Sequence, residues 1–148
     1  MKISKSSDYA LVLLAGLAKE PVANWVSIRL FAEKLGLSAS FLSNIVHKLV
    51  QKGILESQRG AHGGIRLAQP QEMISIGTVL QAMDDPMIIV DCIEAGSGCP
   101  IEHCCEIKEF WSVTHGLILA SLKSITLKDI HQYLKSHRRE KSENELTA

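Results

Sequence analysis

The chain has 148 residues, of which 46% are hydrophobic and 22% are charged. This composition is typical of a globular protein with one domain and at most a small appendage. Its apolar runs are all shorter than the ~18 residues needed to cross a bilayer, and the N-terminus lacks the pattern of a cleavable signal peptide. We therefore expect a cytoplasmic protein without membrane contact.

The formal net charge of zero conceals two oppositely charged halves. Residues 1–69 carry nine Lys or Arg against four Asp or Glu, whereas residues 70–148 carry seven against twelve. A basic half joined to an acidic half favours contact of the first half with a polyanion. An uneven distribution of solvated charges is the alternative interpretation.

Three helices are predicted in the first part of the chain. The first begins at residues 6–8, where a Ser or Asp side chain can cap the free N–H groups, and it stops before Pro21. The second spans residues 28–35 after a capping Ser27. Only a Gly-Leu pair separates it from the third helix, residues 38–52. Such a short glycine-containing turn is the signature of a helix-turn-helix.

The third helix combines an apolar stripe with a polar face. Its polar face consists of short hydrogen-bonding groups followed by a cation, namely Ser40, Ser43, Asn44, His47 and Lys48. These residue types contact base edges and phosphates when a helix lies in a major groove of DNA. An ordinary solvated helix face is the alternative, because polar faces of this kind are common.

Two short strands, residues 54–57 and 65–68, are predicted on either side of the glycine-rich segment 58–64. Three glycines in seven residues predict a tight hairpin tip from which Arg59 and His62 project. A hairpin after three helices is the winged-helix order, and an arginine there is suited to a narrow minor groove. A phosphate-binding loop is disfavoured because the segment lacks the Lys-Ser/Thr ending and the following helix.

The second half contains further helices. We expect a linker at residues 70–72, a short helix over 74–83, a long helix from 106, a terminal helix from 126 to about 136, and a disordered tail over 138–148. Apolar residues recur every three to four positions along the long helix, so this helix needs a partner surface. A second copy of the chain satisfies that need with two-fold symmetry. Packing on its own winged-helix domain is the alternative.

The four cysteines lie within fourteen residues of one another, at Cys92, Cys99, Cys104 and Cys105. In a reducing compartment such a group favours a metal or redox site over a disulfide framework. The loops between them are longer than those of common zinc sites and contain Gly and Pro. The spacing therefore favours an iron–sulfur cluster, and it leaves zinc or a thiol-based redox switch open.

The chain resembles the bacterial iron–sulfur winged-helix regulators of the IscR, NsrR and SufR kind. The resemblance spans about residues 1–134 and rests on these stretches: 7–11 in the first helix, 37–42 at the start of the third helix, 59–67 in the hairpin, three cysteines followed by Trp111, and 125–130. It implies a homodimeric transcription factor, often a repressor, that binds a double-stranded DNA operator according to the state of its cluster. The hairpin and cysteine segments are most similar to regulators of the SUF cluster-assembly system.

The resemblance also implies ligands for a 2Fe-2S or 4Fe-4S cluster. It places three thiolates on Cys92, Cys99 and Cys105. This chain departs from the family in a first cysteine spacing that is one residue longer and in the extra Cys104. Where IscR-like members have a histidine ligand, this chain has Lys108. NsrR-like members use an acid near the start of the first helix of the other subunit, a position held here by Asp8, for which a helix cap is the alternative role. The remaining candidates for the fourth ligand are His103 and Cys104.

The sequence thus predicts a mainly α fold with a β-hairpin wing, built as a winged helix-turn-helix plus a long dimerisation helix. We expect a DNA-binding domain in 1–69, a connecting helix and linker in 70–91, a cluster-binding loop in 92–105, dimerisation and terminal helices in 106–137, and the tail 138–148. The expected major-groove contacts are Ser38, Ser40, Phe41, Asn44, His47 and Lys48, and the expected minor-groove contacts are Arg59 and His62. The expected function is regulation of iron–sulfur assembly genes in response to cluster status, nitric oxide or redox stress. Regulation through zinc or bare thiols is the alternative, and a metal or thiol enzyme is disfavoured because no nucleophile–base–acid set is present.

Overall fold

The computed structural model describes residues 2–60, 63–93 and 98–146, with side chains described up to residue 137. Its helices and strands, in chain order, are α1 (Lys5–Leu17), α2 (Ile28–Leu35), α3 (Ala39–Gln51), β1 (Leu55–Gln58), β2 (Gly64–Leu67), α4 (Ile76–Ala82), α5 (Lys108–Ser124) and α6 (Leu127–Leu146). Three short 3-10 turns complete the assignment: η1 (Gln71–Met73), η2 (Asp91–Ile93) and η3 (Glu102–Cys104). The fold is therefore a helical winged helix-turn-helix followed by a long helix, as the sequence predicts.

The helix-turn-helix is defined by its caps. The hydroxyls of Ser27 and Ser38 accept hydrogen bonds from the backbone at the starts of α2 and α3. Gly36 ends α2 with φ of 66°, a left-handed conformation in which a glycine avoids the steric cost of a Cβ. Because α3 begins so soon after this turn, its position is fixed by α2, and both helices pack on the same core.

The core of the body is formed by the inward faces of α1, α3 and α4 together with both strands. Leu13, Leu14, Leu42, Leu49 and Ile65 are each fully buried there. Burial of a leucine-sized side chain is worth about 1.5–3 kcal/mol, so these residues hold α3 firmly on α1. The apolar stripe that the sequence predicts for α3 is thus confirmed.

Strands β1 and β2 form the antiparallel hairpin of the wing, with Gln58 paired to Gly64 next to the tip. An isolated bridge between Val26 and Ile65 ties the hairpin to the segment before α2. A Cβ at Gly64 would lie 2.4 Å from the carbonyl oxygen of Val26, so a glycine is required there. The wing is consequently held at a fixed angle to the helix-turn-helix.

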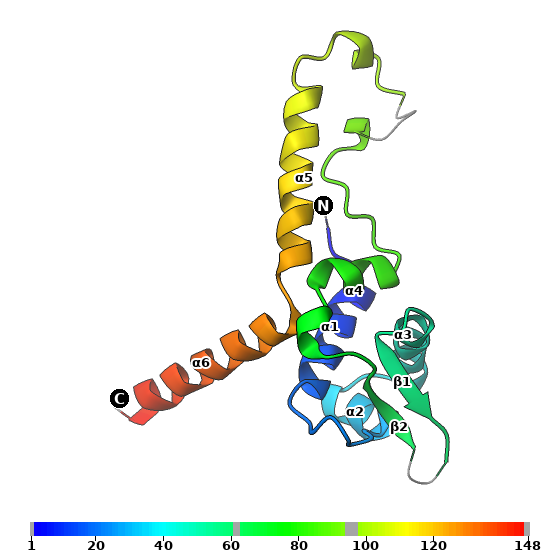
Figure 1. Cartoon of the computed structure of the whole chain (residues 1–148), viewed down its shortest axis with the longest axis vertical. Coiled ribbons are helices and arrows are strands. Elements are labelled where there is room, and N and C mark those ends of the chain that lie inside the picture. Colours follow the sequence, from blue (N-terminus) through cyan, green and yellow to red (C-terminus); the bar gives the residue numbers. More distant parts are fainter. Residues whose placement is uncertain (1, 61–62, 94–97, 147–148) are drawn as a thin grey trace.

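Helix α5 leaves the winged-helix body, and Figure 1 shows it rising away from α1–α4 with the segment that contains the cysteines folded back beside it. This segment contacts α5 through η2 and through a hydrogen bond of 2.7 Å between His115 Nε2 and the carbonyl oxygen of Met87. No residue of α5 is fully buried within the described part of the chain. Helix α6 then projects in another direction, anchored by the buried Leu127.

Several boundaries differ from the sequence-based expectation. Helix α1 begins at Lys5 and is capped by Ser4, so the predicted cap at residues 6–8 is wrong. Each strand is displaced by about one residue along the chain. Helix α6 continues to Leu146, past the predicted end near Ser136, because the Arg, Lys and Glu residues of the predicted tail are good helix formers. Among the described residues, no helix is long and apolar enough to span a membrane.

Candidate nucleic-acid interface and cysteine segment

One line of α3 side chains is open to solvent. Ser40, Asn44 and His47 recur every three to four residues and are all exposed. The structure therefore gathers on one face three of the six α3 residues that the sequence proposed as major-groove contacts. Ser38 lies at the start of the same helix, where its hydroxyl accepts a hydrogen bond of 3.2 Å from Phe41 N.

The remaining two predicted α3 contacts are engaged within the chain. Phe41 is half-buried and packs edge-on against the ring of Tyr9 on α1, with 5.7 Å between the ring centroids. The ammonium of Lys48 lies 2.8 Å from a carboxylate oxygen of Asp84, just beyond α4. Phe41 and Lys48 thus face α1 and α4 in this conformation.

A hollow of about 530 Å³ lies between α2, α3 and the wing. Its lining joins His47 of α3 to Arg59 at the wing, as expected for a surface that follows a DNA backbone. It also includes residues that the sequence-based list of DNA contacts omitted, namely Ser27, Arg29, Ser43 and Gln58. The sequence predicts Ser43 as part of the polar face of α3 but not as a DNA contact. Arg29 could have been identified from its position in the first turn of α2, next to the capping Ser27. His62 lies outside the described residues.

The second wing arginine has a structural role. Arg66 forms an ion pair of 2.8 Å with Glu56 on the opposite strand, and its guanidinium lies 4.4 Å from the ring centroid of Trp25. Both contacts brace the wing against the loop before α2. Arg59 stands at the hairpin tip beyond the end of β1, so it is the wing cation positioned for a ligand.

The four cysteines are free thiols, and they lie in the segment between α4 and α5. Cys92 is in η2, which packs on α5, whereas Cys104 and Cys105 directly precede that helix. Cys104 is exposed and the other three are half-buried. The Cys104 thiol donates to the carbonyl oxygen of Ile101 at 3.5 Å, so it turns back toward its own loop.

Lys108, the first residue of α5, contacts this segment. Its ammonium lies 2.5 Å from a carboxylate oxygen of Glu102. This hydrogen bond raises the pKa of Lys108, desolvation partly offsets it, and the charges of Glu102, Cys92 and Cys105 raise the pKa further. Cys92 and Cys105 therefore lie near the same ammonium, although thirteen positions separate them in the sequence.

The four cysteine thiols are the type of ligand that an iron–sulfur cluster requires. Free, partly accessible cysteines next to a cation are suited to bind as thiolates, the soft ligands that such clusters prefer. Within residues 2–60, 63–93 and 98–146, no three His, Cys, Asp or Glu side chains converge closely enough to hold a single metal ion. Residues 94–97, between Cys92 and Cys99, lie outside the described part.

Asp8 lies on the exposed side of the first turn of α1. Because the Ser4 hydroxyl caps α1, Asp8 does not have the capping role that was its alternative. Its carboxylate makes no hydrogen bond or ion pair with the residues that the structure describes. Figure 1 shows α1 in the body and the described parts of the cysteine segment beside and above the upper half of α5, so a ligand role for Asp8 requires a second subunit.

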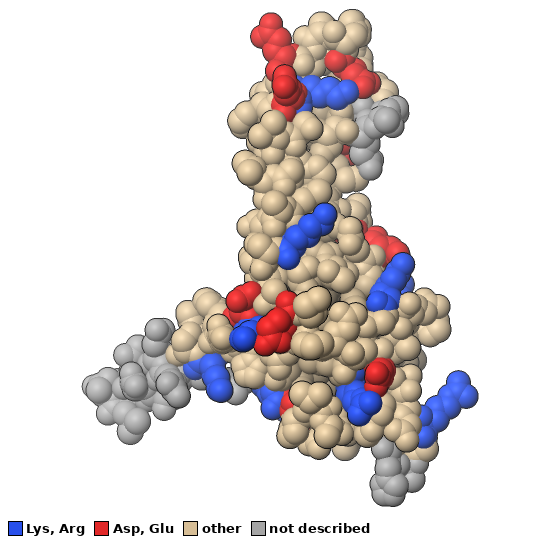
Figure 2. All heavy atoms as spheres, in the orientation of Figure 1, with Lys and Arg blue, Asp and Glu red and all other residues tan. Residues whose placement is uncertain are grey.

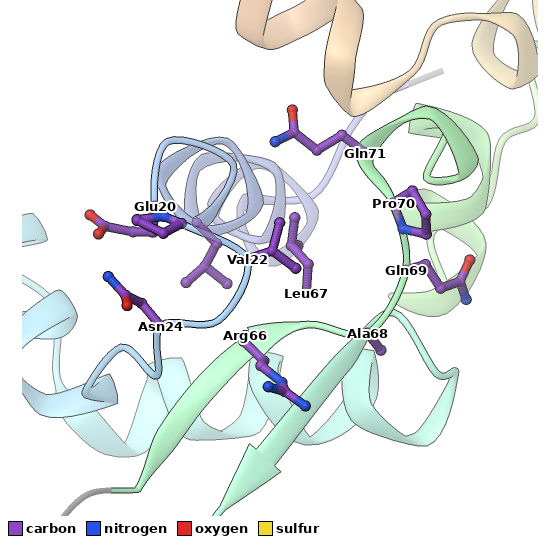
Figure 3. A pocket seen from close by; sticks show the side chains of 11 residues that line it. Glu20, Val22, Asn24, Arg66, Leu67, Ala68, Gln69, Pro70 and Gln71 are labelled. Atoms are coloured by element: carbon purple, nitrogen blue, oxygen red, sulfur yellow. The ribbon is translucent and has the colours of Figure 1, made fainter.

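A separate pocket of about 230 Å³ lies where the end of α1 meets the end of β2, and Figure 3 shows its side chains. Its lining is mostly apolar and includes Leu17, Val22 and Leu67. The amide of Gln71 at its edge donates 2.8 Å to the carbonyl oxygen of Ala18. The pocket contains neither the exposed α3 residues nor the cysteines, so it belongs to neither candidate site.

Comparisons with known proteins agree with this architecture. The profile of a family described as Rrf2, iron-dependent transcriptional regulator, matches residues 3–133. The HTH-type transcriptional regulator NsrR of Bacillus subtilis (strain 168) is 34% identical over 131 residues, which cover 88% of this chain and 90% of that protein. The family match over residues 3–133 spans the helix-turn-helix, the wing and the cysteine segment.

Two solved structures are similar along most of the chain. The structure of CymR, described as the global cysteine regulator of B. subtilis, has a TM-score of 0.73 at 27% identity and covers 90% of this chain and 98% of that chain. The structure of T. potens IscR has a TM-score of 0.69 at 26% identity, with coverages of 90% and 88%. The winged-helix arrangement described above is shared with these transcriptional regulators.

Proposed function

Because this chain belongs to the Rrf2 family of transcriptional regulators, we propose that it is a homodimeric DNA-binding repressor whose affinity for its operator depends on an iron–sulfur cluster held by its cysteine segment. One observation carries this proposal: the same chain has an exposed polar face on α3 next to a wing arginine, and a segment with four free thiols. The physiological signal would be cluster status, nitric oxide or redox stress, and the genes controlled would include those of cluster assembly.

The DNA contacts divide by chemistry. Ser40, Asn44 and His47 would read base edges in the major groove, since their short polar groups are exposed along one line of α3. Arg59 and His62 would enter the flanking minor groove. Ser27 and Arg29 would contact the phosphate backbone at the start of α2, beside the hollow that joins α3 to the wing.

The test of DNA binding is its dependence on salt. If a dimer neutralises six or more phosphates, affinity for an operator falls by about 10³ or more between 50 and 200 mM salt. Arg59→Ala should weaken binding and flatten this dependence, whereas Lys123→Ala, which removes a cation from α5, should change neither. Affinity that is insensitive to salt, or equal losses in both variants, would refute the interface.

The cluster would be held by Cys92, Cys99 and Cys105, with Asp8 of the partner subunit as the fourth ligand. When bound, it supplies a redox- and nitric-oxide-sensitive inorganic group at the start of α5. Lys108 would stabilise the negative charge of the thiolates, as its proximity to Cys92 and Cys105 supports. The charge interaction of Cys105 with Lys108 supports Cys105 over Cys104, whose thiol turns back to Ile101.

Anaerobic purification and a visible absorbance spectrum test this ligand set. Alanine at Cys92, Cys99 or Cys105 should each remove the thiolate-to-iron absorption, because an open coordination position destabilises the cluster. Cys104→Ala is the matched control and should retain it. Loss of the absorption in Cys104→Ala with retention in Cys105→Ala would shift the ligand set by one residue.

Regulation through bare thiols is a second candidate function. It is favoured by the exposure of Cys104 and by the absence of three converging ligands among the described residues. The similarity to a structure described as a global cysteine regulator also supports it. A colourless anaerobic protein whose DNA affinity changes reversibly with a thiol oxidant would establish this function in place of the cluster.

A further inference from the structure

The ion pair between Lys48 and Asp84 joins the DNA-binding helix to the turn that follows α4. The Lys48 ammonium lies 2.8 Å from Asp84 Oδ2 and 3.4 Å from the carbonyl oxygen of Met83. Lys48 follows Asn44 by one helical turn, so its backbone belongs to the face of α3 that carries the exposed polar line. Only its side chain is directed away from that face, toward α4.

The turn that holds Lys48 has a distinctive backbone. Asp84 has φ of 57°, the only positive φ among the described residues other than glycine. Asp is tolerated in this region because its short side chain forms local hydrogen bonds. The lysine contacts hold the pKa of the Asp84 carboxyl below its usual range, chiefly through the hydrogen bond from Lys48. The carboxylate is therefore charged and aimed at α3.

The same turn is connected to the cysteine segment. Asp85 accepts a hydrogen bond of 2.8 Å from the backbone N–H of Ser4 at the start of α1. Two residues later, the carbonyl oxygen of Met87 is held by His115 on α5, and η2 with Cys92 follows. The segment from Pro86 to Cys92 thus leads directly from the turn that holds Lys48 to the cysteine segment.

We propose that Asp84 competes with the DNA phosphates for the Lys48 ammonium and so lowers DNA affinity as long as the turn after α4 keeps its position. This inference rests on the proposed function and gives the DNA-binding face a regulatory contact. When the turn moves, Lys48 turns to the exposed face of α3 and gains a phosphate. Because one exposed ion pair is exchanged for another, DNA affinity should change by no more than about 1.5- to 5-fold for each subunit.

Asp84→Asn tests the competition, because asparagine also tolerates the positive φ and lacks the charge. The probe is a fluorescent duplex of mixed sequence, for which phosphates supply essentially all of the affinity. Asp84→Asn should bind about 1.5- to 5-fold more tightly per subunit. Its slope of log affinity against log salt should steepen by about 0.9 for each lysine released. Asp84→Gly, which also fits a positive φ, provides a second variant if the first folds poorly.

Lys48→Met distinguishes competition from a general effect of charge. In that background Asp84→Asn should leave both affinity and salt slope unchanged, because no ammonium remains to be released. An equal gain with and without Lys48 would overturn the inference, as would weaker or unaltered binding by Asp84→Asn alone. If the wild-type protein shows no salt-dependent binding, the proposed function fails together with the inference. Wild-type binding with an inert Asp84→Asn refutes the inference alone.

Discussion

Ser4 and Asp8, four residues apart in one helix, have separable roles. The Ser4 hydroxyl accepts a hydrogen bond of 3.2 Å from Ser7 N and so caps α1. Ser4→Ala should therefore lower the free energy of unfolding by about 1 kcal/mol. Asp8→Ala should stay within about 0.5 kcal/mol of the wild type, because the exposed carboxylate has no such contact. Urea unfolding of the metal-free protein measures both.

The proposed ligand role of Asp8 has its own readout in the cluster-bound protein. Asp8→Ala should shift the circular dichroism of the cluster, whereas Ser4→Ala should leave it unchanged. A carboxylate is a hard ligand among soft thiolates and is weakly held, so its loss changes the cluster environment without removing all absorption. An unaltered spectrum in Asp8→Ala would redirect the search to His103 or Cys104.

Asp129 makes the stability of the start of α6 depend on pH. Its carboxylate accepts hydrogen bonds from the hydroxyl and the backbone N–H of Thr126, at 2.6 and 2.8 Å. These bonds hold the pKa of Asp129 below its usual range, the hydroxyl contributing most. A carboxyl with a lowered folded-state pKa stabilises the protein above its unfolded-state pKa, and this stabilisation is lost as pH falls through the folded-state value.

We therefore expect Asp129→Asn to lower the urea midpoint at pH 7, with a difference from the wild type that shrinks below about pH 4. The first turn of α6 reports on global unfolding because Leu127 is buried in the core. Thr126→Ser, which keeps the hydroxyl, should retain the wild-type profile. A midpoint difference that stays constant down to pH 3 would contradict this assignment.

At the scale of elements, the first turn of α3 contains one residue that stabilises the helix and another that is proposed to contact DNA. Ser38→Ala removes the cap of α3 and should cost about 1 kcal/mol in unfolding free energy. Ser40→Ala, the same substitution two residues later on the exposed face, should leave stability within about 0.5 kcal/mol and weaken operator binding instead. Parallel urea unfolding and DNA titrations check both variants, and equal losses of stability would contradict the separation.

Local rules predicted the helix-turn-helix because its signals are local. Ser27, Gly36 and Ser38 each act within one helical turn, so their positions in the sequence determine where α2 and α3 begin and end. The engagement of Lys48 by Asp84 was not predicted, since it joins residues far apart in the chain and depends on the packing of α4. The polar pattern of α3 alone therefore assigned Lys48 to the DNA face.

The cysteine site was predictable only in part for the same reason. Spacing identified four thiols as one group, and the structure brings Cys92 and Cys105 near Lys108. The fourth ligand requires a residue from a distant element, and an assembly of two chains if that residue is Asp8. No local pattern encodes such an arrangement, so that ligand remains a proposal.

At the scale of the whole molecule, α5 has two apolar rows with different surroundings. Trp111, Ile118 and Leu122 are half-buried against their own chain. Phe110, Val113 and Leu117 remain 59%, 59% and 68% exposed. The single stripe expected from the sequence is thus two rows. Figure 2 shows the middle of α5 nearly free of charged side chains on the visible face, as expected of a contact between two copies.

Leu117→Glu should convert the dimer into a monomer, because the charge would be desolvated at the centre of the exposed row. Ser112→Glu introduces the same charge on another side of α5 and should leave the dimer intact. Sedimentation measures the mass of both variants. A dimeric Leu117→Glu protein, or dissociation of both, would contradict an interface along this row.

If two copies associate through α5 as proposed, the order of this helix depends on protein concentration, because its own chain fully buries none of its residues. A helix of this length is marginal in water without tertiary contacts, and one of its two apolar rows faces outward. Association stabilises the associated form by mass action, so the thermal midpoint of α5 should rise as the protein becomes more abundant. The cysteine segment rests on this helix. Copy number in the cell would therefore set how many chains have an ordered site at all.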